Sequence, residues 1–173
     1  MMVLSDRKAK INRIAISGVL AALIFVMTFI IKIPIPATGG YINLGDSAII
    51  ISSFILGPFA AIPAAIGSAM CDLVSGYPHY ILPTFIIKGL MGLAAGAVIK
   101  RRKSLPARII AGLAAEIIMV GGYFLFEALP VMYGVEAALS SVPFNAIQGA
   151  CAIIIAIPLS YVRLINKSGI IRD

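Results

Sequence analysis

Hydrophilic side chains with ligand-binding chemistry interrupt the long apolar stretches of this sequence. The main ones are Asp46, Asp72, Lys88, Asn145 and Gln148. A charged or amide group inside an apolar segment is costly, so it needs a partner or a function. Together these groups can donate and accept hydrogen bonds with the hydroxyl, amino and ring-nitrogen groups of a small ligand. They predict a binding site, and no arrangement of nucleophile and base suggests catalysis.

Aromatic and polar residues in two short connections add to this predicted site. They are Tyr41, Asn43, Tyr77, His79 and Tyr80. Aromatic rings stack on flat heterocycles, and a few polar groups fix the orientation of a ligand. We therefore expect a polar and aromatic pocket for a flat heterocyclic molecule.

Each of these residues also fits a structural role. Asp46 suits a helix cap, because a carboxylate at a helix start accepts free backbone N–H groups. Asp72 and Lys88 suit a buried ion pair across a depth difference of about 5 Å at 1.5 Å per residue. Asn145 and Gln148, three residues apart, suit hydrogen bonding between helices.

The remaining polar residues have similar alternatives. His79 suits a solvated loop position, and Tyr77 and Tyr80 suit the aromatic belt at a membrane surface. Glu116 lies about 16 Å from Glu127 along a helix, near the expected midplane. It fits a proton relay, a contact between helices, or the floor of the site.

Composition indicates the environment of these residues. The chain has 173 residues, of which 61% are hydrophobic and 12% charged. A water-soluble domain needs more polar surface, so we expect one all-α integral membrane domain spanning residues 1–173. The net charge of +7 does not indicate nucleic-acid binding, because the basic residues flank apolar runs.

Apolar length and Pro, Gly and charge breaks predict six transmembrane helices. Their expected ranges are 14–31, 46–56, 60–75, 81–99, 107–126 and 142–164. The second is short, and its boundary with the third is the hardest to place. The outward connections are then 33–45, 76–80 and 127–141, so the predicted binding residues share one side and one depth.

The basic residues orient the bundle. All Lys and Arg residues except Lys32 and Lys88 fall on the side of the two termini. These are Arg7, Lys8, Lys10, Arg13, Lys100, Arg101, Arg102, Lys103, Arg108, Arg163, Lys167 and Arg172. Cytoplasmic loops are rich in Lys and Arg, so both termini are expected in the cytoplasm.

Several functions lack their sequence signals. No G-x-x-x-x-G-K-[ST] loop, H-E-x-x-H, G-x-S-x-G or metal-spaced Cys/His cluster occurs, so no cofactor or metal is expected. Small residues instead form stripes that allow helices to approach closely. Ala15, Gly18 and Ala22 suit docking of a partner, whereas Gly92 and Gly96 suit packing within the bundle.

Two segments carry a family resemblance. IKIPIPATGGYINLGDSAIIISSFILGP and DLVSGYPHYILPTFIIKGLMGL resemble the substrate-binding S component of energy-coupling factor (ECF) vitamin transporters. The similar subgroup includes riboflavin, pyridoxine and hydroxymethylpyrimidine binders. G-Y-I-N-L-G-D and G-Y-P-x-Y are the most specific elements.

The resemblance implies a function and partners. It implies a prokaryotic six-helix membrane subunit that holds a vitamin near its extracellular end. It also implies docking through a small-x-x-x-small motif, here Gly18 and Ala22, onto a transmembrane coupling subunit that binds two cytoplasmic ATPases. ATP would be hydrolysed by those partners, so the chain itself is not expected to be an enzyme.

The sequence allows more than one ligand and more than one function. Few aromatic residues and no Trp favour a single-ring ligand, hydroxymethylpyrimidine or pyridoxine, over riboflavin. The alternatives are a riboflavin-specific S component, a stand-alone ion-coupled carrier that uses Glu116, and a small membrane enzyme or assembly factor.

Overall fold

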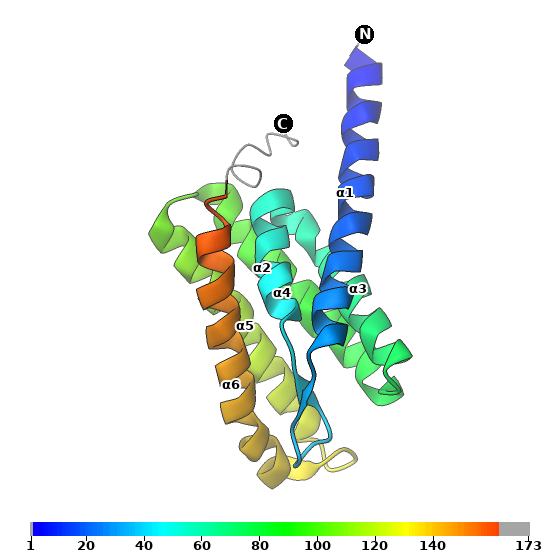
Figure 1. The fold of residues 1–173 in the computed structure, drawn as a ribbon, viewed down its shortest axis with the longest axis vertical. Coiled ribbons are helices and arrows are strands. Elements are labelled where there is room, and N and C mark those ends of the chain that lie inside the picture. The colour runs from blue at the N-terminus through cyan, green and yellow to red at the C-terminus, as the bar shows by residue number, and fades with distance from the viewer. Residues whose placement is uncertain (1, 163–173) are drawn as a thin grey trace.

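The computed structural model describes residues 2–162, and within them the chain is almost entirely helical (Figure 1). Six α-helices follow one another. They are α1 (Met2–Ile30), α2 (Gly45–Leu56), α3 (Ala61–Val74), α4 (Ile81–Arg101), α5 (Leu105–Glu127) and α6 (Gly134–Leu159). A two-stranded antiparallel hairpin, β1 (Ile33–Pro34) and β2 (Tyr41–Ile42), joins α1 to α2. Two 3₁₀ turns, η1 (Gly57–Ala60) and η2 (Pro78–Tyr80), precede α3 and α4.

Helices α2 and α3 run in opposite directions along α4. Asp46 at the start of α2 contacts Lys88, and Gly57 just after α2 lies against Gly96 further along α4, so α2 and α4 are parallel. Helix α3 runs in the opposite direction to α4. Ala60, just before α3, lies against Gly92, whereas Ala65, later in the chain, lies against the earlier Gly89. The η1 turn therefore reverses the chain at one end of the bundle.

The helices have the length and composition of a membrane protein. Five segments of the described chain are long and apolar enough to cross a bilayer, and α2, η1 and α3 together form one of them (Gly45–Val74). Alone, the 12 residues of α2 extend only about 18 Å at 1.5 Å per residue, less than a hydrocarbon core of about 30 Å. The prediction of an all-α membrane protein is confirmed, whereas the count of six spans stays a prediction.

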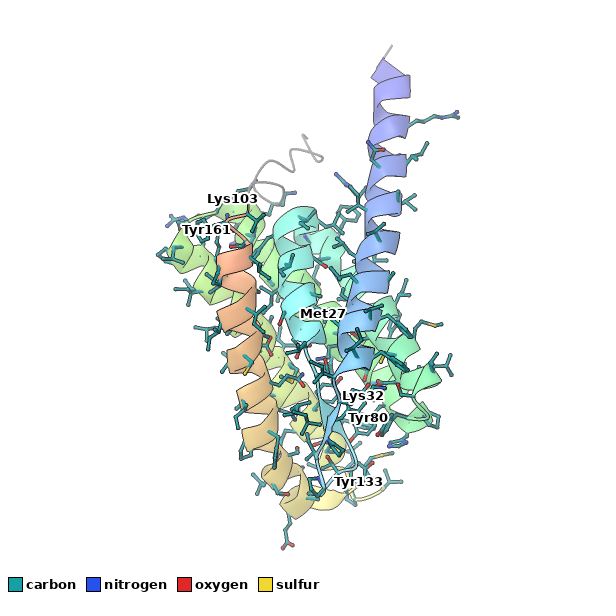
Figure 2. All side chains as sticks on the ribbon, in the orientation of Figure 1. Met27, Lys32, Tyr80, Lys103, Tyr133 and Tyr161 are labelled. Carbon is teal, nitrogen blue, oxygen red and sulfur yellow. The ribbon has the colours of Figure 1, made fainter. Side chains whose placement is uncertain are left out.

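The two ends of the bundle differ in character. Arg13, Lys100 and Lys103 line one groove beside η1 at the end where α1 begins and α6 ends. Lys32, Tyr80 and Tyr133 lie toward the opposite end, far from Lys103 and Tyr161 (Figure 2). The connections predicted to share one side therefore do so, and the basic groove lies at the other end.

Helix α1 begins at Met2, twelve residues before the predicted start at Ile14, because the polar segment before the apolar run is also helical. The predicted boundaries hold closely for α2 to α5 but fail for α6, which ends at Leu159 rather than at Leu164. This helix begins at Gly134 (φ 82°), eight residues before the predicted start, so the connection predicted over 127–141 is much shorter. Pro143 does not end the helix but lies inside it. Ser140 and Ser141 donate hydrogen bonds to the carbonyls of Ala137 and Ala138, which matches helical backbone in the turn before the proline.

Three predicted basic residues and one predicted helix end lie outside the described residues. These are Arg163, Lys167, Arg172 and the end of the last span at Leu164.

Gly92 and Gly96 pack within the bundle, as predicted. A methyl group at Gly92 would lie 2.7 Å from the carbonyl oxygen of Ala60, and one at Gly96 would collide with the backbone of Gly57. Because backbone atoms cannot rotate away, only glycine allows α4 to approach the η1 turn this closely.

Candidate ligand-binding cavity

A cavity lies at the hairpin end of the bundle, enclosed by side chains from several helices. Its lining residues are Thr28, Ile35, Gly40, Tyr41, Asn43, Ser68, Asp72, Tyr80, Thr84, Lys88, Tyr123, Glu127, Asn145 and Gln148. The free space within them is about 40 Å³. At about 10–15 Å³ per water, this holds about three water molecules. A vitamin therefore needs the cavity to expand.

Seven of the ten predicted binding residues line this cavity. They are Tyr41, Asn43, Asp72, Tyr80, Lys88, Asn145 and Gln148. The chain thus brings together residues that are up to 107 positions apart, from Tyr41 to Gln148. The other three, Asp46, Tyr77 and His79, do not line it. Asp46 is fully buried and bonded to Lys88, whereas Tyr77 is half-buried and His79 is exposed.

Lys88 is paired with Asp46, so the predicted pair with Asp72 is wrong. The Lys88 Nζ atom lies 2.5 Å from Asp46 Oδ1, and both side chains are almost fully buried. The prediction compared only depths along α3 and α4. Because α2 runs parallel to α4, the first turn of α2 lies closer to Lys88.

Gln148 holds the other side of Asp46. Its amide nitrogen donates to Asp46 Oδ2 at 2.5 Å, and its amide oxygen accepts from the backbone N–H of Asn43 at 2.7 Å. Asp46 makes no capping hydrogen bond, because Leu44 occupies the N-cap position of α2, and the N–H of Gly45 is instead bonded to Asn43 Oδ1 at 2.8 Å. The Asp46 carboxylate links α2 to α4 and α6.

Asp72 is held by the hairpin between α1 and α2. The Tyr41 hydroxyl donates to Asp72 Oδ1 at 2.7 Å, and the Tyr41 ring packs on Tyr77 with centroids 5.1 Å apart. Burial, and then the nearby Asp72 carboxylate, raise the pKa of Tyr41 above its ordinary value of 10.0. The hydroxyl therefore remains a proton donor to Asp72 throughout the neutral range.

A second set of contacts closes the hairpin over the bundle. Glu127 accepts hydrogen bonds from Tyr80 (3.0 Å) and Ser141, and Tyr80 also reaches the carbonyl of Thr38. Lys32 donates to Ser75 at the other edge of the hairpin. We call residues 33–44 the strap, because Thr38, Tyr41 and Asn43 bond it to residues that line the cavity. Figure 2 shows Lys32 and Tyr80 at this end of the bundle.

His79 and Tyr133 meet at the surface next to the strap. The His79 Nε2 and Tyr133 Oη atoms are 3.0 Å apart, and the His79 ring packs on Tyr80 with centroids 4.7 Å apart. His79 is exposed, so it matches the predicted alternative of a solvated loop residue more closely than a direct ligand contact.

Several cavity residues were missed by the sequence analysis. The polar side chains that line the cavity but were not predicted to do so are Glu127, Tyr123, Thr84, Ser68 and Thr28. Tyr123 and Glu127 lie seven and eleven residues after Glu116, a spacing that places all three on one helix face. Thr84 precedes Lys88 by four residues and Ser68 precedes Asp72 by four, so each shares the face of a residue already singled out.

Glu116 lies beneath the cavity without a hydrogen-bond partner in the described part of the chain. It is only 6% exposed, and it packs against Gly149 of α6. The charges of Asp46 and Lys88 act on it. Of the predicted alternatives, the contact between helices is the one that the packing of Glu116 on Gly149 matches, although no hydrogen bond accompanies it among the described residues.

This arrangement is suited to holding a small polar molecule. It combines aromatic rings, a buried ion pair and hydrogen-bonding groups in an enclosed space. Within residues 2–162 no group of three His, Cys, Asp or Glu residues is arranged to hold a metal ion.

Comparison with known proteins places the chain among transport subunits. Residues 8–165 match the family model described as "ECF-type riboflavin transporter, S component". A solved structure described as "Structure and mechanism of the S component of a bacterial ECF transporter" is similar with a TM-score of 0.72 and 29% identity. The match covers 91% of this chain and 97% of that one.

Two relatives are similar over most of their length. The thiamine precursor transporter HmpT of Lactococcus lactis subsp. cremoris is 33% identical over 172 residues, 98% of this chain and 96% of the relative. A Pyrococcus woesei protein, described as "Uncharacterized protein in gap 3'region", is 33% identical over 138 residues, 79% of this chain and 91% of the relative. The matched family model and the relative from Lactococcus lactis thus name two different classes of vitamin compound, riboflavin and a thiamine precursor.

Proposed function

This chain belongs to the S-component family of ECF transporters, and we propose that it captures a small heterocyclic vitamin or vitamin precursor at the extracellular side of the cell membrane. It is a multi-pass membrane transport subunit of a vitamin uptake system. The enclosed polar cavity beneath the strap is the observation that carries the proposal of a ligand site. We favour hydroxymethylpyrimidine or pyridoxine as the ligand, because one aromatic ring demands the least expansion of a cavity of about 40 Å³.

The proposed topology follows from the charges and the chain reversal at η1. Six passes in a single membrane domain, with both termini in the cytoplasm, would place the basic groove inside and the strap outside. The antiparallel course of α2 and α3 supports two short passes rather than one.

Binding by the purified chain tests the proposed function directly. Titration calorimetry in detergent with hydroxymethylpyrimidine, pyridoxine and riboflavin should give one ligand bound per chain for one of the three. Uptake into liposomes should then require the partner subunits and ATP. If none of the three vitamins binds, the proposed ligand class is wrong.

Partner docking is proposed to use the small-residue stripe of α1. Ala15, Gly18 and Ala22 are exposed, and a methyl group at Gly18 would meet nothing within 4 Å. This open face can accept a helix of the transmembrane coupling subunit, which binds two cytoplasmic ATPases.

The docking proposal has a matched control within the chain. Gly18→Leu should leave vitamin binding intact but prevent co-purification with the coupling subunit. Gly121 of α5 also has open space around it, so Gly121→Leu makes the same change on another helix and should leave assembly intact. Equal co-purification of both variants would remove α1 as the docking face.

Two alternative functions are each supported by one observation. A riboflavin-specific S component is favoured by the description of the matched family model. A stand-alone ion-coupled carrier is favoured by the unpartnered carboxyl of Glu116. Uptake by the chain alone in ATP-free liposomes, driven by an ion gradient and lost in Glu116→Gln, would select the carrier.

A further inference from the structure

Most polar groups that line the cavity are already satisfied by the protein. Lys88 is bonded to Asp46, Gln148 bonds Asp46 and Asn43, Thr84 pairs with Tyr123, and Glu127 accepts from Tyr80 and Ser141. Lys88 can still bind a ligand without losing this bond, because an ammonium has three N–H groups and one of them is used by Asp46. The buried polar atoms that have no partner at all are the more specific indication of the ligand, because each of them requires a partner when the site is filled.

Two polar groups of α3 that line the cavity are buried and have an atom without a hydrogen-bond partner. The Asp72 Oδ2 and Ser68 Oγ atoms have no hydrogen-bond partner anywhere in residues 2–162. Asp72 is 5% exposed and Ser68 is 2% exposed, and both line the cavity. A buried polar atom without a partner is costly, so a group at this position is expected to be paired when the site is filled.

Ser68 and Asp72 present a defined pattern to a ligand. They are four residues apart, so they are one turn apart on the same face of α3. An ionised carboxylate oxygen only accepts hydrogen bonds, whereas a serine hydroxyl can donate one. A ligand edge that satisfies both has an N–H donor beside a nitrogen or oxygen acceptor.

Building on the proposed function, we propose that Ser68 and Asp72 together determine substrate specificity by reading the amidine edge of an aminopyrimidine. The exocyclic amino group donates to Asp72 Oδ2, and the Ser68 hydroxyl donates to the adjacent ring nitrogen. Tyr41 keeps the carboxylate in place by donating to its other oxygen. Pyridoxine has no amino group beside a ring nitrogen, so it leaves this pair unmatched.

Ligand pairs that differ in one group test this assignment. The reference ligand is 4-amino-5-hydroxymethyl-2-methylpyrimidine. One analogue lacks the amino group, and a second has C–H in place of the ring nitrogen beside the amino-bearing carbon. The wild-type chain should bind the first analogue about 10–100-fold more weakly, as expected for a lost bond to a charged group, and the second about 3–10-fold more weakly.

Two variants should each remove one of these preferences. Asp72→Leu, which keeps the branched shape, should abolish discrimination against the analogue without the amino group. Ser68→Ala should abolish discrimination against the C–H analogue only. Ser47→Ala is the matched control, because Ser47 is also a buried serine without a partner among the described residues but does not line the cavity.

The outcomes separate this inference from the proposed function. Loss of discrimination by each variant for its own analogue supports the pair as the specificity determinant. Equal weakening of all three ligands in Ser68→Ala and Asp72→Leu would overturn it, as would a wild-type chain that does not distinguish them. Tight binding of riboflavin or pyridoxine without the aminopyrimidine would overturn the inference alone, and binding of no vitamin would overturn both.

Discussion

Lys88 is the buried cation that organises the base of the cavity. It is bonded to Asp46, which Gln148 holds from the other side, so residues of α2, α4 and α6 meet at one carboxylate. Removing one member of a buried ion pair leaves the other charge unpaired in a medium that solvates it poorly. The pair therefore contributes to the stability of the bundle as well as to the shape of the site.

Lys88→Met should destabilise the purified protein by about 3–5 kcal/mol, because Asp46 is left buried and uncompensated. The double variant Asp46→Asn with Lys88→Met removes both charges and should recover part of the loss. Thermal unfolding in detergent measures the stability of both variants. It can be followed by the fluorescence of a thiol-reactive dye or by light scattering, because the chain has no tryptophan. A double variant less stable than Lys88→Met would contradict this role for the pair.

The sequence predicted which residues gather at the cavity better than it predicted their partners. Asp46, Asp72 and Lys88 stand out because they interrupt apolar segments. Their pairing depends on how α2 lies against α4, and that depends on a strap and a chain reversal that periodicity does not specify. Ser68 was missed because a serine in an apolar helix is common, and only its burial without a partner distinguishes it.

At the scale of elements, hydrogen bonds from several parts of the bundle hold the strap beside the cavity. Residues 33–44 are bonded to α3 by Tyr41 and Asp72, to α6 by Asn43 and Gln148, and to the η2 turn through Thr38 and Tyr80. The buried side chain of Ile35 adds apolar packing to these hydrogen bonds.

Glu127→Ala should loosen the strap, because Tyr80 and Ser141 lose their shared acceptor. Hydrogen exchange of residues 33–44 should become faster by about 5–10-fold, as expected for about 1–1.5 kcal/mol lost from the closed form. Exchange in α4 below Lys88 should stay unchanged and serves as an internal control. Equal acceleration along both segments would mean that Glu127 stabilises the whole bundle rather than the strap.

The contact between α4 and η1 gives a second prediction at this scale. Gly92→Ala places a methyl group 2.7 Å from the Ala60 carbonyl oxygen and should destabilise the protein by about 1–3 kcal/mol, as overpacking does. Gly18→Ala adds the same methyl group where nothing lies within 4 Å and should leave the unfolding temperature unchanged. Similar unfolding temperatures for the two variants would show that α4 can move away from η1.

Helix positions followed from apolar length, whereas two features of the elements did not. The start of α6 was placed eight residues too late, because Glu136, Ser140 and Ser141 interrupt the apolar run before residue 142 although they are helical. The alignment of Glu116, Tyr123 and Glu127 was present in the spacing, but Glu127 was treated only as the end of a span.

At the scale of the whole molecule, the exposed basic residues and the polar cavity lie at opposite ends. Basic residues surround the groove beside η1, whereas the cavity and the strap occupy the other end. This separation is what the sequence predicted most securely, because it depends on many residues rather than on one contact. Under the proposed function, this separation would let one end select the ligand while α1 stays available to partner subunits.

The most direct test of the cavity as a vitamin site is native mass spectrometry of the purified chain mixed with hydroxymethylpyrimidine, pyridoxine and riboflavin. We expect one vitamin to remain bound per chain and to be lost from Asn145→Leu, which fills the cavity from α6 without touching the Asp46–Lys88 pair. Retention of no vitamin, or equal retention by Asn145→Leu and the wild-type chain, would contradict the assignment of this cavity as the binding site.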